Sequence, residues 1–486
     1  MTASVRLSLL WGPIFFLGVV FRLADLATPP MHADEAVGAK ITADRLEGRG
    51  YVFDPSHYHG PALTWIGAKV SALAGKTTYV ALDAFELRLV PAVAGSLVVL
   101  FPALLGRWLG TTSSLAAGLL LATSPLLCMY SRLYIHETLL VFFSSLALLS
   151  LAWWMRSQDF RAAILGGIAV GFMAATKETF VIPVLAWIVG LVFVWREINR
   201  TSLIGSLGLA VLCFFGVVAA AYGNPLHFFS TYAGYETDPG HAKPLLYYLE
   251  LLIWPKFHAP QWWSEGGIAI LALVGGWLGW KQKNSWLKLL AVSSVVQIVI
   301  YSMISYKTPW LMAVTWMQVC ALAGVGAVAL VSFASIARRV FGTIAVVLIV
   351  GFQLQQARAA VFRFPSDARN PLAFVPTSTN VEPLARRLHA LHERSQAYRG
   401  SRIAVVGKGY WPLPWYLRGV GEAGYYDEMP PNPGAFAVVI AMPESIEETA
   451  RILSDSHQMF FNGLRHEFPI TVFVRHDVRA EEVEKQ

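Results

Sequence analysis

Two adjacent carboxylates, Asp34 and Glu35, stand just after the first apolar stretch of the chain. A carboxylate so close to hydrocarbon loses hydration, and its pKa tends to shift. Such a pair could accept a proton as a general base or bind a hard divalent cation. It could equally be a solvated pair at a helix start, where acids favour the positive end of the helix dipole. Taken alone, the pair does not decide between chemistry and capping.

Three basic residues, Arg132, Lys177 and Lys307, stand at the ends of other apolar stretches. An unpaired cation at such a place is costly, and a lipid phosphate would compensate its charge. Each residue alone could instead extend toward water or pair with an acid, such as Glu178 beside Lys177. Several cations at one depth favour a shared phosphate site.

These groups fit a substrate that joins a long lipid, a phosphate and a sugar. Sugar transfer from such a lipid needs a base for the acceptor hydroxyl and cations for the leaving phosphate. We therefore predict that Asp34 is the base and that Glu35 orients it or binds substrate. His59, next to a rigid Gly-Pro pair, is predicted to bond to sugar or phosphate. A divalent metal at the two acids stays open, whereas the histidine spacings match no zinc motif.

The composition identifies a membrane protein. Of the 486 residues, 55% are hydrophobic and only 14% are charged, which excludes an ordinary soluble domain. The net charge of +7 could suggest nucleic acid as a partner. Membrane proteins, however, collect Lys and Arg in cytoplasmic loops, so we attribute the charge to membrane topology and expect no nucleic acid partner.

Eleven apolar stretches are long enough to cross a bilayer. The first is Leu7 to Leu26, and the others begin near Leu87, Ser114, Leu133, Ala162, Thr179, Leu203, Gly266, Leu287, Trp310 and Val340. Alternate connections carry the basic residues, which places the N-terminus in the cytoplasm and the C-terminal tail outside. The acids and cations described above then share the outer face, where one cavity would gather them. Within the first outer loop, apolar residues spaced three and four apart predict two amphipathic helices along the membrane surface.

A composition change after Phe364 predicts two domains, a membrane domain over residues 1–364 and an extracytoplasmic α/β domain over residues 365–486. The second domain should contain strands at Ile403–Val406, Phe436–Met442 and Ile470–Val474 and helices at Glu382–Ala397 and Ser445–Leu453. Its Gly407-Lys408-Gly409 turn lacks the spacing of a phosphate-binding loop, and we expect an ordinary turn there.

The order of these motifs across successive outer loops resembles the GT-C superfamily of membrane glycosyltransferases. The nearest branch is glycosyltransferase family 39, which includes protein O-mannosyltransferases and aminoarabinose transferases. Two further motifs are similar to a bacterial and archaeal subgroup called flippase-activity-associated proteins. The motifs after the acidic pair are Tyr58-His59-Gly60-Pro61, Ser131-Arg132 with Glu137, Lys177-Glu178, Gly240-His241-Ala242-Lys243-Pro244 and Tyr306-Lys307-Thr308-Pro309-Trp310-Leu311.

The resemblance implies a polyprenyl-phosphate sugar donor, an inverting transfer outside the cytoplasm, and residence in the inner (plasma) membrane. It assigns catalysis to Asp34, with Glu35 beside it. Substrate contacts would fall on the matching motif residues His59, Arg132, Glu137, Lys177, Glu178, His241, Lys243 and Lys307. The acceptor stays open between a lipid, a glycan and a protein, since the chain lacks the large luminal insertion of the eukaryotic mannosyltransferases. A lipid-linked-sugar flippase or non-catalytic accessory protein is the alternative, and a scaffold whose tail binds a partner is a third.

Overall fold

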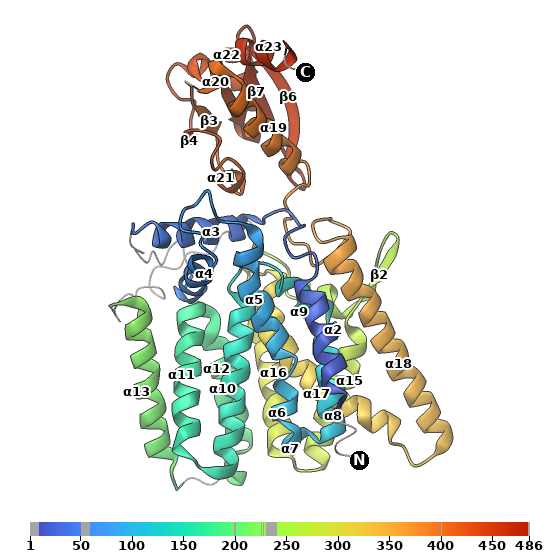
Figure 1. Ribbon diagram of the computed structural model, residues 1–486. Helices are drawn as coiled ribbons and strands as arrows, with labels where there is room; N and C mark the ends of the chain where they lie inside the picture. The colour runs from blue at the N-terminus through green and yellow to red at the C-terminus, as the bar shows by residue number, and fades with distance from the viewer. Residues whose placement is uncertain are drawn as a thin grey trace.

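The computed structural model describes residues 9–49, 59–198, 201–224, 226, 228–229, 241–399 and 401–484. Of the motif residues above, Tyr58 and Gly240 lie outside the described residues. A bundle of long helices forms one part of the molecule, and a small α/β domain stands at one end of it (Figure 1). Helix η6 (Ala359–Arg363) ends one residue before the predicted boundary, and the division into two domains at that point stays a prediction.

Each of the eleven predicted apolar stretches contains a helix. Six helical segments are long and apolar enough to cross a membrane: Ala84–Leu104, Glu137–Ser157, Leu203–Tyr222, Ser285–Met303, Pro309–Val331 and Ile336–Arg363. They contain α5 (Ala84–Val98), α10 (Glu137–Ser157), α13 (Leu203–Tyr222), α16 (Ser285–Met303), α17 (Ala313–Val331) and α18 (Ile336–Arg358). The other stretches hold shorter helices, namely α2 (Trp11–Leu23), α8 (Thr111–Thr123), α11 (Phe160–Thr176), α12 (Val181–Phe193) and α15 (Gly266–Lys281). The chain is thus a largely helical membrane protein, and the exact number of spans stays a prediction.

Short elements connect these helices. They include α6 (Phe101–Leu104), α7 (Gly106–Leu109), α9 (Pro125–Tyr130), η1 (Glu178–Phe180), η2 (Trp195–Glu197), η4 (Leu249–Ile253), β1 (Lys256–His258), β2 (Gln261–Trp263) and η5 (Pro309–Met312). Helix α17 forms the centre of the bundle, since every residue from 313 to 327 is buried. The polar Gln318 on this helix is satisfied inside the protein, where it accepts bonds from Trp187 (3.3 Å) and Ser293 (2.7 Å).

Two helices, α3 (Ala33–Leu46) and α4 (Ala62–Leu73), lie in the segment between α2 and α5, where two helices were predicted, and Figure 1 shows α3 lying across the end of the bundle. Tyr134 holds both: its hydroxyl is 2.9 Å from Thr42 Oγ1 and 3.1 Å from the Leu63 carbonyl oxygen. The ring passes so close to Gly67 that a Cβ there would lie 1.9 Å from the hydroxyl. The position of the two helices on a membrane surface stays a prediction.

The C-terminal domain contains a five-stranded sheet in the order β4-β3-β5-β7-β6. Strands β3 (Ile403–Val406), β4 (Ala423–Tyr426) and β5 (Val438–Ala441) are parallel, and β7 (Phe468–Arg475) and β6 (His457–Arg465) complete the sheet in antiparallel pairing. The helices are α19 (Val381–Arg394), α20 (Gln396–Arg399), α21 (Leu413–Tyr416), α22 (Ile446–Leu453) and α23 (His476–Glu484), with short turns η7 (Pro433–Ala435) and η8 (Pro443–Ser445). Strands β4 and β6 were not predicted, because neither reads as a continuous apolar run.

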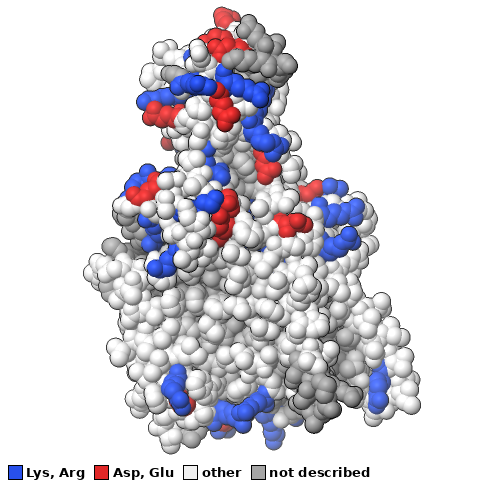
Figure 2. Space-filling model, in the orientation of Figure 1, with Lys and Arg blue, Asp and Glu red and all other residues white. Residues whose placement is uncertain are grey.

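The C-terminal domain contacts the first outer loop directly. Met31 links the two parts twice: its N–H donates to the Tyr416 hydroxyl (2.8 Å), and its carbonyl accepts from Thr377 (2.7 Å). Arg418 also donates to the Leu82 carbonyl (3.1 Å). On the face in Figure 2, a broad band without charged residues separates the charged groups at the two ends of the molecule. The domain therefore sits at the end of the bundle that holds Asp34.

Candidate active site

Glu35 and Arg88 form a fully buried ion pair at the base of the first loop. The guanidinium of Arg88, on α5, donates to both carboxylate oxygens of Glu35 at 2.7 Å. The same carboxylate accepts the backbone N–H groups of His32 (2.9 Å) and Tyr134 (2.7 Å). Because both oxygens are occupied and the side chain is inaccessible, Glu35 cannot touch a substrate. Of the two roles predicted for it, only the orienting one is compatible with this geometry.

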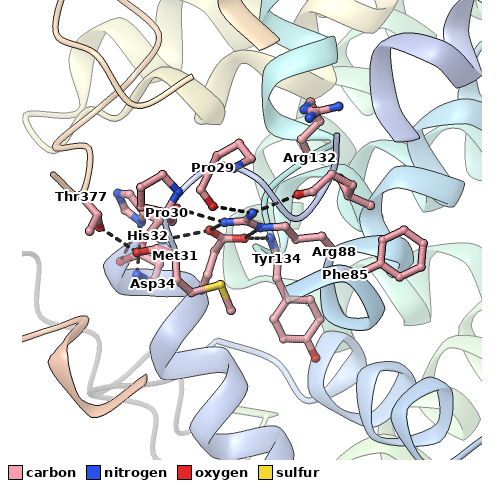
Figure 3. Close-up of polar contacts among 12 residues, drawn as sticks. Pro29, Pro30, Met31, His32, Asp34, Phe85, Arg88, Arg132, Tyr134 and Thr377 are labelled. Carbon is pink, nitrogen blue, oxygen red and sulfur yellow. Dashed lines mark hydrogen bonds and ion pairs between the residues drawn. The ribbon is translucent and has the colours of Figure 1, made fainter. Parts of the chain in front are cut away.

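Arg88 also fixes the chain that leads to the acidic pair. It donates to the carbonyl groups of Leu26 (3.0 Å), Pro29 (2.8 Å) and Pro30 (3.0 Å), and Figure 3 shows Arg88 beside the two prolines. With the two bonds to Glu35, all five N–H groups of this arginine are used. The turn between α2 and α3 is therefore held by one buried side chain.

The Glu35–Arg88 pair is expected to make stability fall in acid. Burial raises the pKa of Glu35, but the charge and hydrogen bonds of Arg88, together with the backbone N–H groups of His32 and Tyr134, outweigh it and hold the pKa below its ordinary value. A carboxylate with a lowered folded-state pKa stabilises the fold above its unfolded pKa of about 4.3, and this contribution is lost as pH falls through the folded pKa. Melting temperatures between pH 7 and pH 3 should therefore fall more steeply for the wild type than for Glu35→Gln. Parallel curves would contradict this expectation, and Asp44→Asn on the same helix serves as the matched control.

Asp34 differs from its neighbour because its side chain is 55% exposed. It occupies the first turn of α3, where His32 is the N-cap residue. The Asp34 N–H donates to His32 Nδ1 (3.2 Å), and Nδ1 lies 4.0 Å from the carboxylate. Figure 3 shows Asp34 beside His32, with Arg132 at the opposite end of the group. Asp34 is thus a fixed, accessible carboxylate that can exchange protons with a bound hydroxyl.

A small pocket lies between His32 and Arg132. Its walls come from the loop before α3, from α9 and the turn that follows it, from Trp310 and from the segment between η6 and α19, which we call the linker. The lining includes Pro30, His32, Tyr130, Arg132, Trp310 and Phe374. Aromatic rings make edge contacts here, with Trp310 5.6 Å from Tyr130 and 5.4 Å from Phe374 between ring centroids. Asp34 is not among the residues that line this pocket; its backbone N–H is bonded to the ring of His32, which does line it.

Arg132 brings a positive charge to the pocket, which the nearby Asp25 carboxylate and the Phe362 ring, 5.4 Å from the guanidinium carbon, offset only in part. It is 2% exposed and donates to the carbonyl groups of Phe21 (3.2 Å), Ala24 (2.7 Å) and Asp25 (2.9 Å) at the end of α2. Within the described residues, its remaining two N–H groups have no partner and its charge has no carboxylate in contact. Burial and the charge of Arg88 lower the pKa of Arg132 to about 10. An anion bound in the pocket would compensate this charge.

The predicted motif residues His241, Lys243 and Lys307 meet in space. An antiparallel bridge pairs Ala242 with Tyr306, so the two motifs lie side by side. The ammonium of Lys307 donates to the carbonyl groups of Lys243 (3.2 Å) and Ile304, and burial lowers its pKa. The His241 ring contacts Phe374, a residue of the pocket wall, at 5.3 Å between centroids. The loops that carry His241 and Lys307 therefore lie behind the part of the pocket wall that Phe374 forms.

The other four predicted residues form a second polar cluster. Lys177 makes an ion pair with Glu137, both being buried, and it also interacts electrostatically with Glu178 beside it. His59 Nδ1 lies 3.0 Å from the carboxylate of Glu178, and its ring contacts His136 at 4.9 Å. These contacts join α4, α10 and the start of α12. Since their charges are paired within the protein, this cluster differs in character from the site of Arg132.

The donor set at the acidic pair does not fit a metal ion. Both oxygens of Glu35 are bonded to Arg88 and to backbone N–H groups, which leaves Asp34 as the single carboxylate facing outward. Elsewhere in the described part of the chain, no group of three or more His, Cys, Asp or Glu side chains could hold a metal. We therefore derive no step through a metal at this site.

Three residues of the site were missed from the sequence. Arg88 had a readable signal, since a charged residue inside an apolar stretch is costly and needs a partner. His32 had a weaker one: it precedes Glu35 by three residues, the spacing of a capping box, but histidine is not a usual cap. Phe374 had no signal, because only the folded linker brings it to the pocket.

Comparisons with known proteins agree with a membrane-enzyme fold. Residues 58–220 match the family model described as dolichyl-phosphate-mannose-protein mannosyltransferase. ArnT from Cupriavidus metallidurans in the apo state superposes with a TM-score of 0.66 at 13% identity, covering 99% of both chains. Its structure bound to undecaprenyl phosphate gives a TM-score of 0.61 at 15% identity, covering 98% of this chain and 99% of that one.

A second similar structure is the oligosaccharyltransferase of Archaeoglobus fulgidus tethered with an acceptor peptide. It gives a TM-score of 0.63 at 11% identity, covering 95% of this chain and 73% of that chain. No curated protein matches the sequence. At these identities the structural similarities establish the fold, and they extend over nearly the whole chain.

Proposed function

We propose that this chain, which has the fold of the GT-C superfamily of membrane glycosyltransferases as its motifs predicted, transfers a sugar from a polyprenyl-phosphate donor to an acceptor outside the cytoplasm. One observation carries the proposal. An accessible carboxylate, Asp34, is bonded through its backbone to His32, which lines a pocket whose wall also holds Arg132, a buried cation with no ion-pair partner among the described residues. A base and an anion site are the two groups that such a transfer requires.

The donor phosphate is assigned to Arg132. Its unused N–H groups are Nε–H and one hydrogen on Nη2, and a guanidinium can donate such groups to the oxygens of a phosphate. Lys307 supplies a second positive charge behind the pocket wall. Similarity in fold to a protein solved with undecaprenyl phosphate supports a lipid phosphate as the anion.

The reaction follows as a single displacement. The acceptor oxygen attacks the anomeric carbon while Asp34 takes its proton, and the bond from that carbon to the phosphate oxygen breaks. Positive charge at Arg132 and Lys307 stabilises the leaving phosphate as its negative charge grows. Because Asp34 is half exposed, it can return the proton to solvent. One displacement at one face inverts the configuration of the sugar, and the acceptor is a lipid, glycan or protein hydroxyl.

The orientation of the chain is part of the proposal. We place the N-terminus in the cytoplasm of a cell with this protein in its inner membrane, and the C-terminal domain outside, because basic residues dominate the predicted cytoplasmic connections. Asp34, Arg132 and the C-terminal domain then share the outer side.

Removing the charge of Arg132 or Lys307, neither of which forms an ion pair within the described part of the chain, is expected to weaken donor binding. Arg132→Gln should raise the Kd for undecaprenyl phosphate by about 10- to 100-fold, the loss of a charge-assisted hydrogen bond of about 1.5–3 kcal/mol. Lys307→Met should act in the same direction with a smaller effect, since its ammonium faces backbone carbonyls. Thermophoresis with the purified protein measures both, and Lys69→Gln, an exposed lysine on α4, is the control. An unchanged Kd for Arg132→Gln would contradict the assignment.

The function itself is tested by reconstitution. Proteoliposomes with the protein are given labelled polyprenyl-phosphate sugars and an acceptor fraction, and the labelled glycoside is measured. Product formation supports the transferase. Movement of labelled lipid across the membrane without any product would favour the flippase instead.

A further inference from the structure

We infer that His32 is a positioning residue for Asp34 and that the linker backbone at Phe374 sets its orientation, so that the C-terminal domain acts on the base through its linker. This inference rests on the proposed function. It starts from an unusual choice of residue: helices are normally capped by Ser, Thr, Asp or Asn, yet α3 is capped by a histidine. A histidine has a second ring nitrogen, and here that nitrogen is also bonded.

The two bonds of the ring define its tautomer. Nδ1 accepts the N–H of Asp34 (3.2 Å), so the proton of the neutral ring is on Nε2. Nε2 lies 3.1 Å from the Phe374 carbonyl and therefore donates to it. The ring therefore connects the backbone of Asp34, in the first turn of α3, to the backbone of Phe374 in the linker.

Packing leaves this ring one orientation. His32 is 9% exposed, and its ring stands edge-on against Trp310 at 6.0 Å between centroids. Trp310 is itself held between Tyr130 and Phe374. A rotation of the imidazole would break both hydrogen bonds and displace the aromatic rings.

The linker is fixed by contacts on both sides of Phe374. Tyr130 donates to the Leu372 carbonyl (2.6 Å), and Thr377 donates to the Met31 carbonyl (2.7 Å). Between them, Val375 has a φ of 44°, which is strained for a β-branched residue. Such strain persists where the surrounding contacts determine the conformation. Thr377 also pairs with Arg465 of β6, so a movement of the C-terminal domain reaches the Phe374 carbonyl.

A double-mutant cycle tests this coupling. Asparagine at position 32 can still cap the helix but is too short to reach the Phe374 carbonyl. His32→Asn should therefore lower the melting temperature only slightly while kcat falls about tenfold, as expected for a misplaced base, and because His32 lines the donor pocket KM for the donor should change less than kcat. His32→Ala should lose melting temperature as well. Thr377→Val, which removes the bond to Met31 with little change of shape, should lower kcat several-fold, and Thr379→Val is the control.

The decisive measurement is kcat of the double variant that combines His32→Asn with Thr377→Val. If the linker acts through His32, Thr377→Val should cause little further loss of kcat in a protein that already carries His32→Asn. Additive effects, or full kcat in His32→Asn, would overturn the inference and leave His32 as a cap only. Absence of sugar transfer by the wild type would instead count against the proposed function, so the two failures are distinct.

Discussion

Asp34→Asn is expected to lower kcat for sugar transfer by about 10²- to 10⁴-fold, the usual contribution of a general base. The amide has nearly the shape of the carboxylate but does not accept the proton of the acceptor. Because the side chain is 55% exposed and bears no buried ion pair, the fold should be nearly unaffected. The Kd for undecaprenyl phosphate should also stay unchanged, since the phosphate is assigned to Arg132. Mass spectrometry of the product gives kcat.

The matched control for this variant is Asp44→Asn, on the same helix. Asp44 pairs with Lys40 and Arg49 and is not among the residues that line the described pocket. It should keep wild-type kcat. Equal losses in both variants would mean that any carboxylate change on α3 disturbs the enzyme, and the base would then need another assignment.

Arg88→Ala is expected to cost about 3–5 kcal/mol of folding free energy, because it leaves the buried carboxylate of Glu35 without its partner. It also removes the donors to the carbonyl groups of Leu26, Pro29 and Pro30, so the turn before Asp34 loses its support. We expect little folded protein and no transfer activity. Thermal unfolding in detergent, followed by tryptophan fluorescence, measures the effect.

Two further variants separate the charge from the hydrogen bonds. Arg88→Lys keeps the charge but not the bidentate geometry, and should be destabilised less than Arg88→Ala. Arg88→Met combined with Glu35→Gln removes both buried charges and should be more stable than Arg88→Ala alone. A melting temperature like that of the wild type for Arg88→Ala would show that the pair contributes nothing.

Much of the architecture could be read from the sequence because hydrophobic length is a strong signal. All eleven apolar stretches contain a helix, and α3 and α4 follow from residues spaced three and four apart. In the C-terminal domain, β3, β5 and β7 were found from apolar runs. Strand β6 was missed because its sequence, HQMFFNGLR, alternates poorly, and pairing with β7 rather than local preference makes it a strand.

The sequence indicated which residues belong to the site, but not which of them pair with other residues of the protein. Order along the chain places Asp34, Arg132 and Lys307 on one face, yet it does not say which charges are neutralised inside the protein. Glu35 forms an ion pair with Arg88, 53 residues away in the sequence, and Lys177 forms one with Glu137, 40 residues away. Such pairings depend on helix packing, so a sequence pattern alone cannot distinguish a buried ion pair from a ligand site.

The central claim is that a single exposed carboxylate activates the acceptor against a lipid-phosphate sugar. The anomeric configuration of the product tests it most directly. Wild-type protein in nanodiscs is given polyprenyl-phosphate sugars of known configuration and the membrane fraction of a strain lacking the gene, and the product is analysed by NMR. One displacement assisted by Asp34 predicts a glycoside of inverted configuration, absent with Asp34→Asn. A product of retained configuration, or equal product from Asp34→Asn, would contradict it.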